Sequence, residues 1–210
     1  MSLFRLDTSI FPGTSASAEL AGAIEAEWTA GRPGAQVVRR DLGSNPLPAD
    51  AMALAISAGY TPEEDRTPAQ LEALSLAATL ATELQDAEAV LLAVPLYNYG
   101  VSQHFKTWVD LVIAATDAKH PVLAGKPTVL ATVRGGSYGP GTPREGWDHS
   151  TPYLRRILAD LWQADLTVIE RELTLVGVVP EMDALKDLAA SLHADALAAA
   201  RDAGKALAAR

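Results

Sequence analysis

The 210-residue sequence contains no cysteine. This absence excludes disulfide bonds, a thiol nucleophile, CxxC redox chemistry and a zinc site built from thiolates. Any redox activity must therefore come from a bound cofactor. Four histidines are scattered along the chain, and His104 and His120 lack the paired spacing of a helical zinc motif. We therefore expect no metal site.

Positive charge is scarce, with 17 basic against 26 acidic residues and a formal net charge of −9. The acidic excess argues against nucleic-acid or anionic-membrane partners, which need a basic stripe to neutralise phosphates. No apolar stretch approaches the ~20 residues of a membrane span. The first residues, MSLFRLDTS, lack the basic region and the long apolar region of a signal peptide. We expect a cytoplasmic protein with no membrane partner.

Hydrophobic periodicity predicts strands that alternate with helices along one domain, residues 1–210. The expected strands are 3–7, 35–39, 88–94, 127–133 and 166–175. The expected helices are 17–30, a short one near 50–58, and others that begin at about residues 67, 102 and 182. Such alternation predicts an α/β fold with a five-stranded, doubly wound parallel sheet and helices on both faces. We expect the flavodoxin-like strand order 2-1-3-4-5.

Ligands of such folds bind beyond the carboxyl ends of the strands. Three loops should meet there, namely 8–17, 95–102 and 133–148. The first carries five hydroxyl side chains before a predicted helix. Free amides and the helix dipole at that position suit a phosphate, although ordinary helix capping would also favour serine and threonine. Because no GxxxxGK[ST] or GxGxxG motif follows a strand, the pattern favours a mononucleotide over a P-loop or a Rossmann dinucleotide site.

The second loop contains Tyr97, Asn98, Tyr99 and Gly100 directly after an apolar strand. Two aromatic rings, an amide side chain and a glycine suit the face and edge of a planar heteroaromatic ring. The alternative is simple aromatic packing at the end of a strand.

The third loop begins Arg134-Gly135-Gly136. Consecutive glycines can present backbone N–H groups to an oxygen that gains negative charge, and Arg134 could reinforce them. The alternative is that the glycines only punctuate a loop. Taken together, a phosphate pocket, a ring platform and an anion-stabilising rim at one sheet edge predict a flavin mononucleotide (FMN) site.

These residues resemble the FMN-dependent NADH-azoreductases, also described as quinone oxidoreductases, of the flavodoxin-like superfamily. The stretch Leu96–Tyr99 resembles the family's M-Y-N-F, and Val133–Gly136 resembles its S-R-G-G. The other matching stretches are Ser9 with 15–17, 151–154 and 179–181. The resemblance implies FMN contacts from Ser9, Ser15, Ala16, Ser17, Leu96, Tyr97, Asn98, Tyr99, Val133, Arg134, Gly135 and Gly136. Tyr99, Gly135 and Gly136 are also candidate catalytic positions.

Three features depart from the family pattern. Ala16 replaces a glutamine, Val133 replaces a serine, and the segment 117–124 is short and has no aromatic residue. Relatives often place aromatic residues over the flavin from that last region. The loop 137–148 instead carries Tyr138 and Trp147, and our hypothesis is that these two residues form part of the substrate wall.

The resemblance further implies a homodimer with the flavin near the interface. It implies electron transfer from NADH or NADPH to quinones and aromatic azo compounds, with the two substrates using one pocket in turn. The alternative reading is a flavodoxin-type FMN electron-transfer protein that turns over no small molecule, which the acidic net charge would suit. A flavin-free hydrolase is disfavoured because no GxSxG elbow is present.

Overall fold

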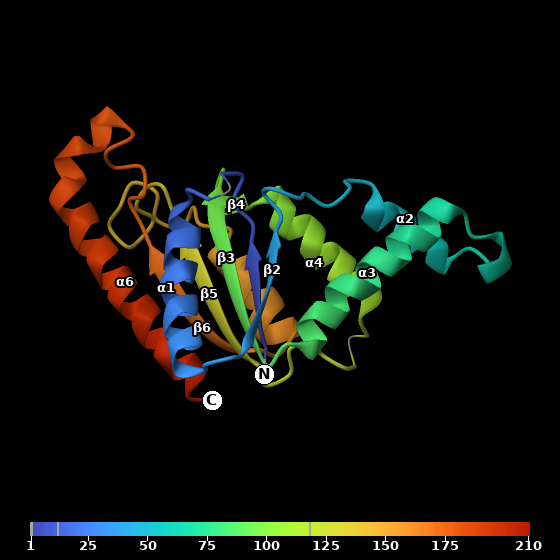
Figure 1. Ribbon diagram of the computed structural model, residues 1–210. Coiled ribbons are helices and arrows are strands. Elements are labelled where there is room, and N and C mark those ends of the chain that lie inside the picture. Colours follow the sequence, from blue (N-terminus) through green and yellow to red (C-terminus); the bar gives the residue numbers. More distant parts are fainter. Residues whose placement is uncertain (1, 12, 118) are drawn as a thin grey trace.

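The computed structural model describes residues 2–11, 13–117 and 119–210. Its parallel strands are β1 (Ser2–Asp7), β2 (Gln36–Asp41), β3 (Ala89–Tyr97), β5 (Pro127–Val133) and β6 (Asp165–Arg171). They lie in the order β2-β1-β3-β5-β6 (Figure 1), which confirms the predicted 2-1-3-4-5 winding. The sequence did not predict β4 (Gly100–Val101), a short strand that pairs antiparallel with the end of β3.

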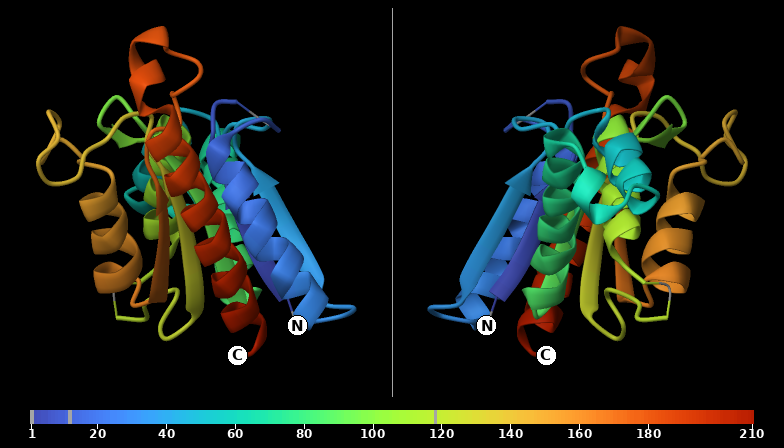
Figure 2. Two further views of the ribbon diagram at one scale, coloured as in Figure 1. Left: turned by 90° about the vertical axis from the view of Figure 1, so that its left-hand side faces the viewer. Right: turned by 90° about the vertical axis from the view of Figure 1, so that its right-hand side faces the viewer.

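Helices cover both faces of the sheet, as Figures 1 and 2 show. One face carries α1 (Ala16–Gly31) and α6 (Lys186–Ala208). The other carries α2 (Ala51–Gly59), α3 (Pro68–Asp86), α4 (Gln103–Ala115) and α5 (Thr151–Arg155). The predicted capping box at the start of α3 is present: the Gln70 amide N–H donates to the Thr67 hydroxyl, and Gln70 Oε1 accepts from the Thr67 amide.

The largest differences from the sequence prediction are at two boundaries and one helix. The last strand ends at Arg171 rather than at residue 175, because Leu173 has a φ of 60° that no extended strand accommodates. A 3₁₀ turn, Pro180–Leu185, occupies the predicted start of the last helix, so that α6 begins at Lys186. Helix α5 and its continuation as a π-helix, Arg156–Leu161, were not predicted from the sequence.

The two faces of the sheet are packed with different kinds of side chain. On the α3–α5 face, Trp108 is fully buried and stacks on Phe4 at 6.5 Å, while Trp162 meets it edge-on at 5.5 Å. On the other face small residues allow close approach: a side chain at Gly204 of α6 would place its Cβ 2.4 Å from the Ile24 carbonyl oxygen of α1. Between these layers, residues 89–96 of β3 are buried on both sides, as expected for a central parallel strand.

Helix α2 and the start of α3 project sideways from the body of the molecule (Figure 1). This projection exposes Ile56, Leu71 and, at 89% of its surface, Tyr60. None of the helices in the described part of the chain is long and apolar enough to cross a membrane.

Candidate functional site

The first two predicted loops meet at the carboxyl edge of the sheet. The Tyr97 hydroxyl lies 2.9 Å from Ser9 Oγ and accepts a hydrogen bond from the Ile10 amide at 3.3 Å. Tyr97 stands at the end of β3 and Ser9 follows β1, its direct neighbour in the sheet. The phenol therefore ties the expected ring platform to the expected phosphate loop, which explains in part why a buried strand ends in tyrosine.

A feature that the sequence analysis did not identify holds Ser9 from the other side. The Cβ of any side chain at Gly43 would lie 2.1 Å from the Ser9 carbonyl oxygen, so only glycine fits there. Asp41, at the end of β2, shapes this turn by accepting from the Gly43 amide at 2.9 Å and from the Ser44 hydroxyl at 2.7 Å. An acid at the end of a strand and a glycine two residues later were the only sequence signals for this support.

The start of α1 combines both functions considered for the hydroxyl-rich loop. Ser15 caps the helix, because its Oγ accepts from the Ala18 amide at 3.1 Å and lies 3.2 Å from Ser17 Oγ. Capping is therefore confirmed, yet the first-turn amides and the positive end of the dipole still favour an anion. Ser15 and Ala16 line a hollow of about 510 Å³ beside Arg171. Pro12, within the same loop, lies outside the described residues.

The turn between β3 and β4 is strained. Its two central residues, Asn98 and Tyr99, have φ values of 48° and 70°, the signs of a type I′ hairpin turn. Asparagine tolerates this region, whereas a tyrosine there costs on the order of 1–3 kcal/mol. Strain of this kind persists only where the surrounding structure imposes it, and it is common at ligand-binding sites.

Tyr99 also forms the centre of an aromatic cluster. Trp147 and Tyr138 meet its ring edge-on, at centroid distances of 5.6 and 6.4 Å. The His149 amide donates to the Tyr99 carbonyl at 2.9 Å. The third loop therefore reaches the second, and the three predicted loops form one continuous edge. We call Tyr99, Tyr138 and Trp147 the aromatic rim.

Arg134 is committed to other protein groups. Its guanidinium is bonded to Asp148 at 2.7 Å, to Glu170 at 2.6 Å and to Glu172 at 3.3 Å, and the residue is only 8% exposed. It also donates to the Thr151 hydroxyl at 2.9 Å. Burial by itself lowers the pKa of Arg134, but the hydrogen bonds and charges of Glu170 and Asp148 raise it above the ordinary value. The guanidinium therefore holds protein carboxylates, and it is the backbone of the loop that remains for a ligand.

The two glycines that follow Arg134 have packing roles. A Cβ at Gly135 would lie 2.6 Å from Leu175 Cδ1, and one at Gly136 would lie 2.8 Å from an Arg144 nitrogen. Their carbonyls accept from the Leu175 and Leu173 amides. Val133, 5% exposed, pairs with Pro95 inside the sheet. Leu96, 8% exposed, pairs with Val101 of β4.

A cleft of about 1060 Å³ opens between these loops. It is lined by Ile10, Phe11, Tyr97, Asn98, Gly100, Val101, Gln103, Lys106, His149, Tyr153 and Leu175. Of the predicted site residues, only Tyr97 and Asn98 are in this set. The aromatic rim lies beside the cleft, because Tyr99 directly follows Asn98 and its carbonyl accepts from the amide of His149, which also lines the cleft. Burial, with the nearby charge of Asp110, raises the pKa of Tyr153 to about 12, so its hydroxyl stays protonated near neutral pH.

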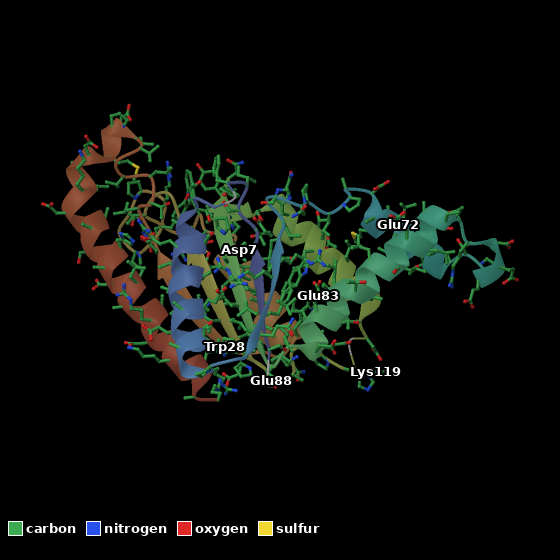
Figure 3. The ribbon with its side chains drawn as sticks, in the orientation of Figure 1. Asp7, Trp28, Glu72, Glu83, Glu88 and Lys119 are labelled. Carbon is green, nitrogen blue, oxygen red and sulfur yellow. The ribbon has the colours of Figure 1, made fainter. Side chains whose placement is uncertain are left out.

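The segment 117–124, which departs from the family pattern, lies away from the cleft. The segment 117–124 follows α4 at the opposite, amino-terminal edge of the sheet, where Figure 3 labels Lys119; Ala118 is outside the described residues. Within its own chain this segment is therefore remote from the site. In the described part of the chain, no three histidine or acidic side chains are grouped so that they could hold a metal ion.

The strand order and the loops at the strand ends define a flavodoxin-like protein, and a model of the flavodoxin-like fold family matches residues 1–196. A relative from Frankia casuarinae, named FMN-dependent NADH:quinone oxidoreductase, is 39% identical over 95% of this chain and 96% of its own. The chain belongs to this oxidoreductase family.

Solved structures agree with the fold. An azoreductase from Bacillus anthracis strain Sterne has a TM-score of 0.76 at 20% identity and covers 97% of this chain and 98% of its own. An FMN-dependent NADH-azoreductase from the Ames Ancestor strain, solved in complex with FMN, has a TM-score of 0.75 at 13% identity, with 99% of each chain covered. At these identities the structural likeness supports the fold alone.

Proposed function

We propose that this protein binds FMN at the carboxyl edge of its sheet and transfers electrons from NADH or NADPH to quinones and aromatic azo compounds. The observation that carries the proposal is the cleft at the carboxyl edge, which is lined by residues of the first two loops and by His149, directly after the third. The bond between Tyr97 and Ser9 joins the first two loops. The names of the relative and of the solved azoreductases support the same activity.

The chemistry of the side chains and amides fits FMN. We assign the phosphate to the amides at the start of α1 and to Ser9, Ser15, Ala16 and Ser17, since hydroxyls and a helix N-terminus bind a phosphate group without a dedicated cation. We assign the ring to Leu96–Tyr99 and to the backbone of Val133–Gly136. The cleft is large enough for a cofactor ring and a stacked substrate.

A bound flavin supplies the hydride and electron transfer; the protein supplies position and electrostatics. In the proposed site the amides of Gly135 and Gly136 stabilise negative charge, and Tyr99 or solvent delivers protons. The protonated Tyr153 hydroxyl is a further hydrogen-bond donor in the cleft. The hypothesis for Tyr138 and Trp147 is retained in modified form: they support the substrate wall from beside the cleft. Because one cleft serves the nicotinamide and then the acceptor, the kinetics should be ping-pong.

We further propose that the protein is a homodimer with the flavin near the interface, and that it acts in the cytoplasm, where reduced nicotinamide is available. Exposed apolar side chains support the dimer, both on the α2–α3 projection, at Tyr60, and beside the cleft, where Phe11 is 60% exposed. Sedimentation equilibrium should give twice the chain mass, and Tyr60→Asp should shift the equilibrium toward monomer. A monomeric wild-type protein would refute this part of the proposal.

The function is tested by initial rates of NADH oxidation with a soluble quinone and no added reductase. We expect FMN-dependent turnover and parallel lines in double-reciprocal plots at several quinone concentrations. An azo dye should consume two equivalents of NADH, because complete cleavage takes two rounds of reduction. A flavodoxin-type electron carrier would bind FMN but show no such turnover, and intersecting lines would contradict the shared cleft.

A further inference from the structure

Three charged side chains close the base of the loop that carries Tyr138 and Trp147. Arg134 lies just before this loop, residues 137–148, Asp148 is its last residue, and Glu172 lies just beyond β6. The Glu172 carboxylate accepts from the Ser137 hydroxyl at 2.6 Å and from the Tyr138 amide at 2.9 Å. It therefore fixes the first turn of the loop, next to the first residue of the aromatic rim.

The other end of the loop is fixed by Asp148. Its Oδ2 accepts from Arg134 Nε at 2.7 Å, and its Oδ1 accepts from the Ser150 and Thr151 amides at 2.8 and 2.9 Å. Trp147 directly precedes Asp148. His149 directly follows it, lines the cleft and donates its amide to Tyr99. Arg134 joins both ends, since it also reaches Glu172 at 3.3 Å. We call Arg134, Asp148 and Glu172 the clamp.

The clamp residues are largely buried, with side-chain exposures of 9%, 14% and 18%. Removing one partner from a buried ion pair is costly, so the closed arrangement resists opening. The aromatic rim needs such support because Tyr99 occupies a strained backbone region and Trp147 is half exposed. Neither residue has a helix or strand of its own to hold it on the cleft side.

We propose that Glu172, acting through the clamp, is a positioning residue that holds the aromatic rim and His149 in place and thereby sets the affinity of the cleft for its acceptor. The role in acceptor binding rests on the proposed function. The role in loop closure does not, because it concerns only contacts within this chain.

The loop closure is tested in the cofactor-free protein by acrylamide quenching of tryptophan fluorescence. Trp147 is 51% exposed, whereas Trp28, Trp108 and Trp162 are at most 2% exposed, so quenching reports on Trp147. In Glu172→Ala the quenching constant should rise by up to about twofold, because local opening uncovers the rest of the indole. Adding Trp147→Phe should abolish the rise. Ser137→Ala, which breaks one bond to Glu172, should raise the constant by less.

The matched control is Glu83→Ala. Glu83 has a side-chain exposure of 19% and is paired with Arg40, but it lies on α3, away from the carboxyl-edge loops (Figure 3). It should leave the quenching constant unchanged. Equal quenching in the Glu172 and Glu83 variants would overturn the positioning role, whatever the enzyme's activity proves to be.

The effect on binding is read as a split between KM and kcat in the FMN-loaded protein. Glu172→Ala should raise the KM for a quinone several-fold with a smaller change in kcat, and Glu172→Gln, which retains one acceptor oxygen, should recover part of the loss. Glu83→Ala should change neither. If the Glu172→Ala variant quenches as expected but keeps a wild-type KM, the link from the clamp to acceptor binding is refuted.

Discussion

The two edges of the sheet are built differently, although the same strands begin at one and end at the other. At the amino-terminal edge, Lys126 Nζ donates to the Gln85 carbonyl at 2.9 Å and closes the end of α3. The Gly125 amide donates to the Gln163 carbonyl there, and the φ of 57° at Gln163 falls just past the end of a helix, where the left-handed region is common. This edge is closed by ordinary capping.

The carboxyl-terminal edge instead combines strain, buried charge and exposed aromatic surface. Tyr99 has a φ of 70°, Arg134 is buried among three carboxylates, and Phe11 and Trp147 are more than half exposed. Features that oppose folding are tolerated at functional sites when the rest of the molecule compensates for them. The packed layers therefore supply most of the stability, whereas the carboxyl edge has the features of a ligand-binding site.

The largest expected effect is that of Arg134→Met. It removes the cation from the largely buried Asp148 and Glu172 and leaves Glu170 only its longer, 3.6 Å pair with Arg155, so the free energy of unfolding in urea should fall by about 3–5 kcal/mol. Arg40→Met is the control, because Arg40 pairs with the single carboxylate of Glu83 at the outer strand β2. It should cost less, about 1–2 kcal/mol, because only one partly buried carboxylate loses its partner. Equal losses would show that the buried charges of the carboxyl edge have no special weight.

The next effect concerns the packed layer between α1 and α6. Gly204→Val should lower the free energy of unfolding by about 2–3 kcal/mol, because its Cβ would meet the Ile24 carbonyl at 2.4 Å. Gly22→Ala in α1 is the control: nothing lies within 4 Å of its Cβ, and better helix propensity should stabilise the protein by about 0.5–1 kcal/mol. FMN affinity should change in neither variant. If Gly204→Val weakened FMN binding in the folded protein, stability and binding would not be separable as we argue.

Tyr97→Phe tests the junction of the two loops. Losing the bonds to Ser9 and Ile10 should raise the Kd for FMN by about tenfold, the equivalent of one net hydrogen bond of roughly 1.4 kcal/mol. The measurement is quenching of flavin fluorescence. Tyr60→Phe, which alters an 89% exposed tyrosine on the projection, should leave the Kd unchanged. An unchanged Kd in Tyr97→Phe would show that the Tyr97 hydroxyl does not help the phosphate loop to bind FMN.

Asn98→Ala tests the strained turn. Alanine at a φ of 48° should cost about 1 kcal/mol of stability, whereas Asn98→Gly should be nearly neutral. Thermal unfolding of the two variants measures the difference. If both variants unfold at the wild-type temperature, the turn stores no strain of this kind.

The smallest expected effect concerns how the free energy of unfolding depends on pH under acidic conditions. Burial alone raises the pKa of Asp148, but hydrogen bonds from Thr151 and the charge of Arg134 lower it below the ordinary value. Its stabilising contribution is therefore complete above the unfolded pKa of about 3.9 and is lost as the pH falls through the lower folded pKa. Asp148→Asn should flatten the dependence of unfolding free energy on pH in that window. An identical slope would contradict this assignment.

Much of the fold could be predicted because its signals are local. Thr67 and Gln70 form the expected capping box, and Ser102 caps α4 as expected. The meeting of loops 8–17, 95–102 and 133–148 followed from parallel topology alone, since the carboxyl ends of parallel strands share an edge. The contact between Ser9 and Tyr97, 88 residues apart, realises that expectation.

What could not be predicted depends on tertiary contacts without a local signal. Gly43 looks like an ordinary turn glycine until Ser9 packs against it. Glu172, which the sequence placed inside a strand, faces Arg134 only because Leu173 turns the chain back toward Gly136. A sequence also does not show whether an arginine is paired with carboxylates of the same protein or is available to a ligand. This is why Arg134 was expected to face a ligand. The meeting of the loops could therefore be predicted from the sequence, but the contacts that support them could not.

The most direct test of the account is a comparative titration of the cofactor-free protein with FMN and with riboflavin, followed by flavin fluorescence. If the loops of the carboxyl edge hold a phosphorylated ring, one FMN should bind per chain. Riboflavin should bind about a hundredfold more weakly, because it forfeits two charge-assisted hydrogen bonds at the start of α1. Equal affinities for the two flavins, or no binding of FMN, would contradict the central claim.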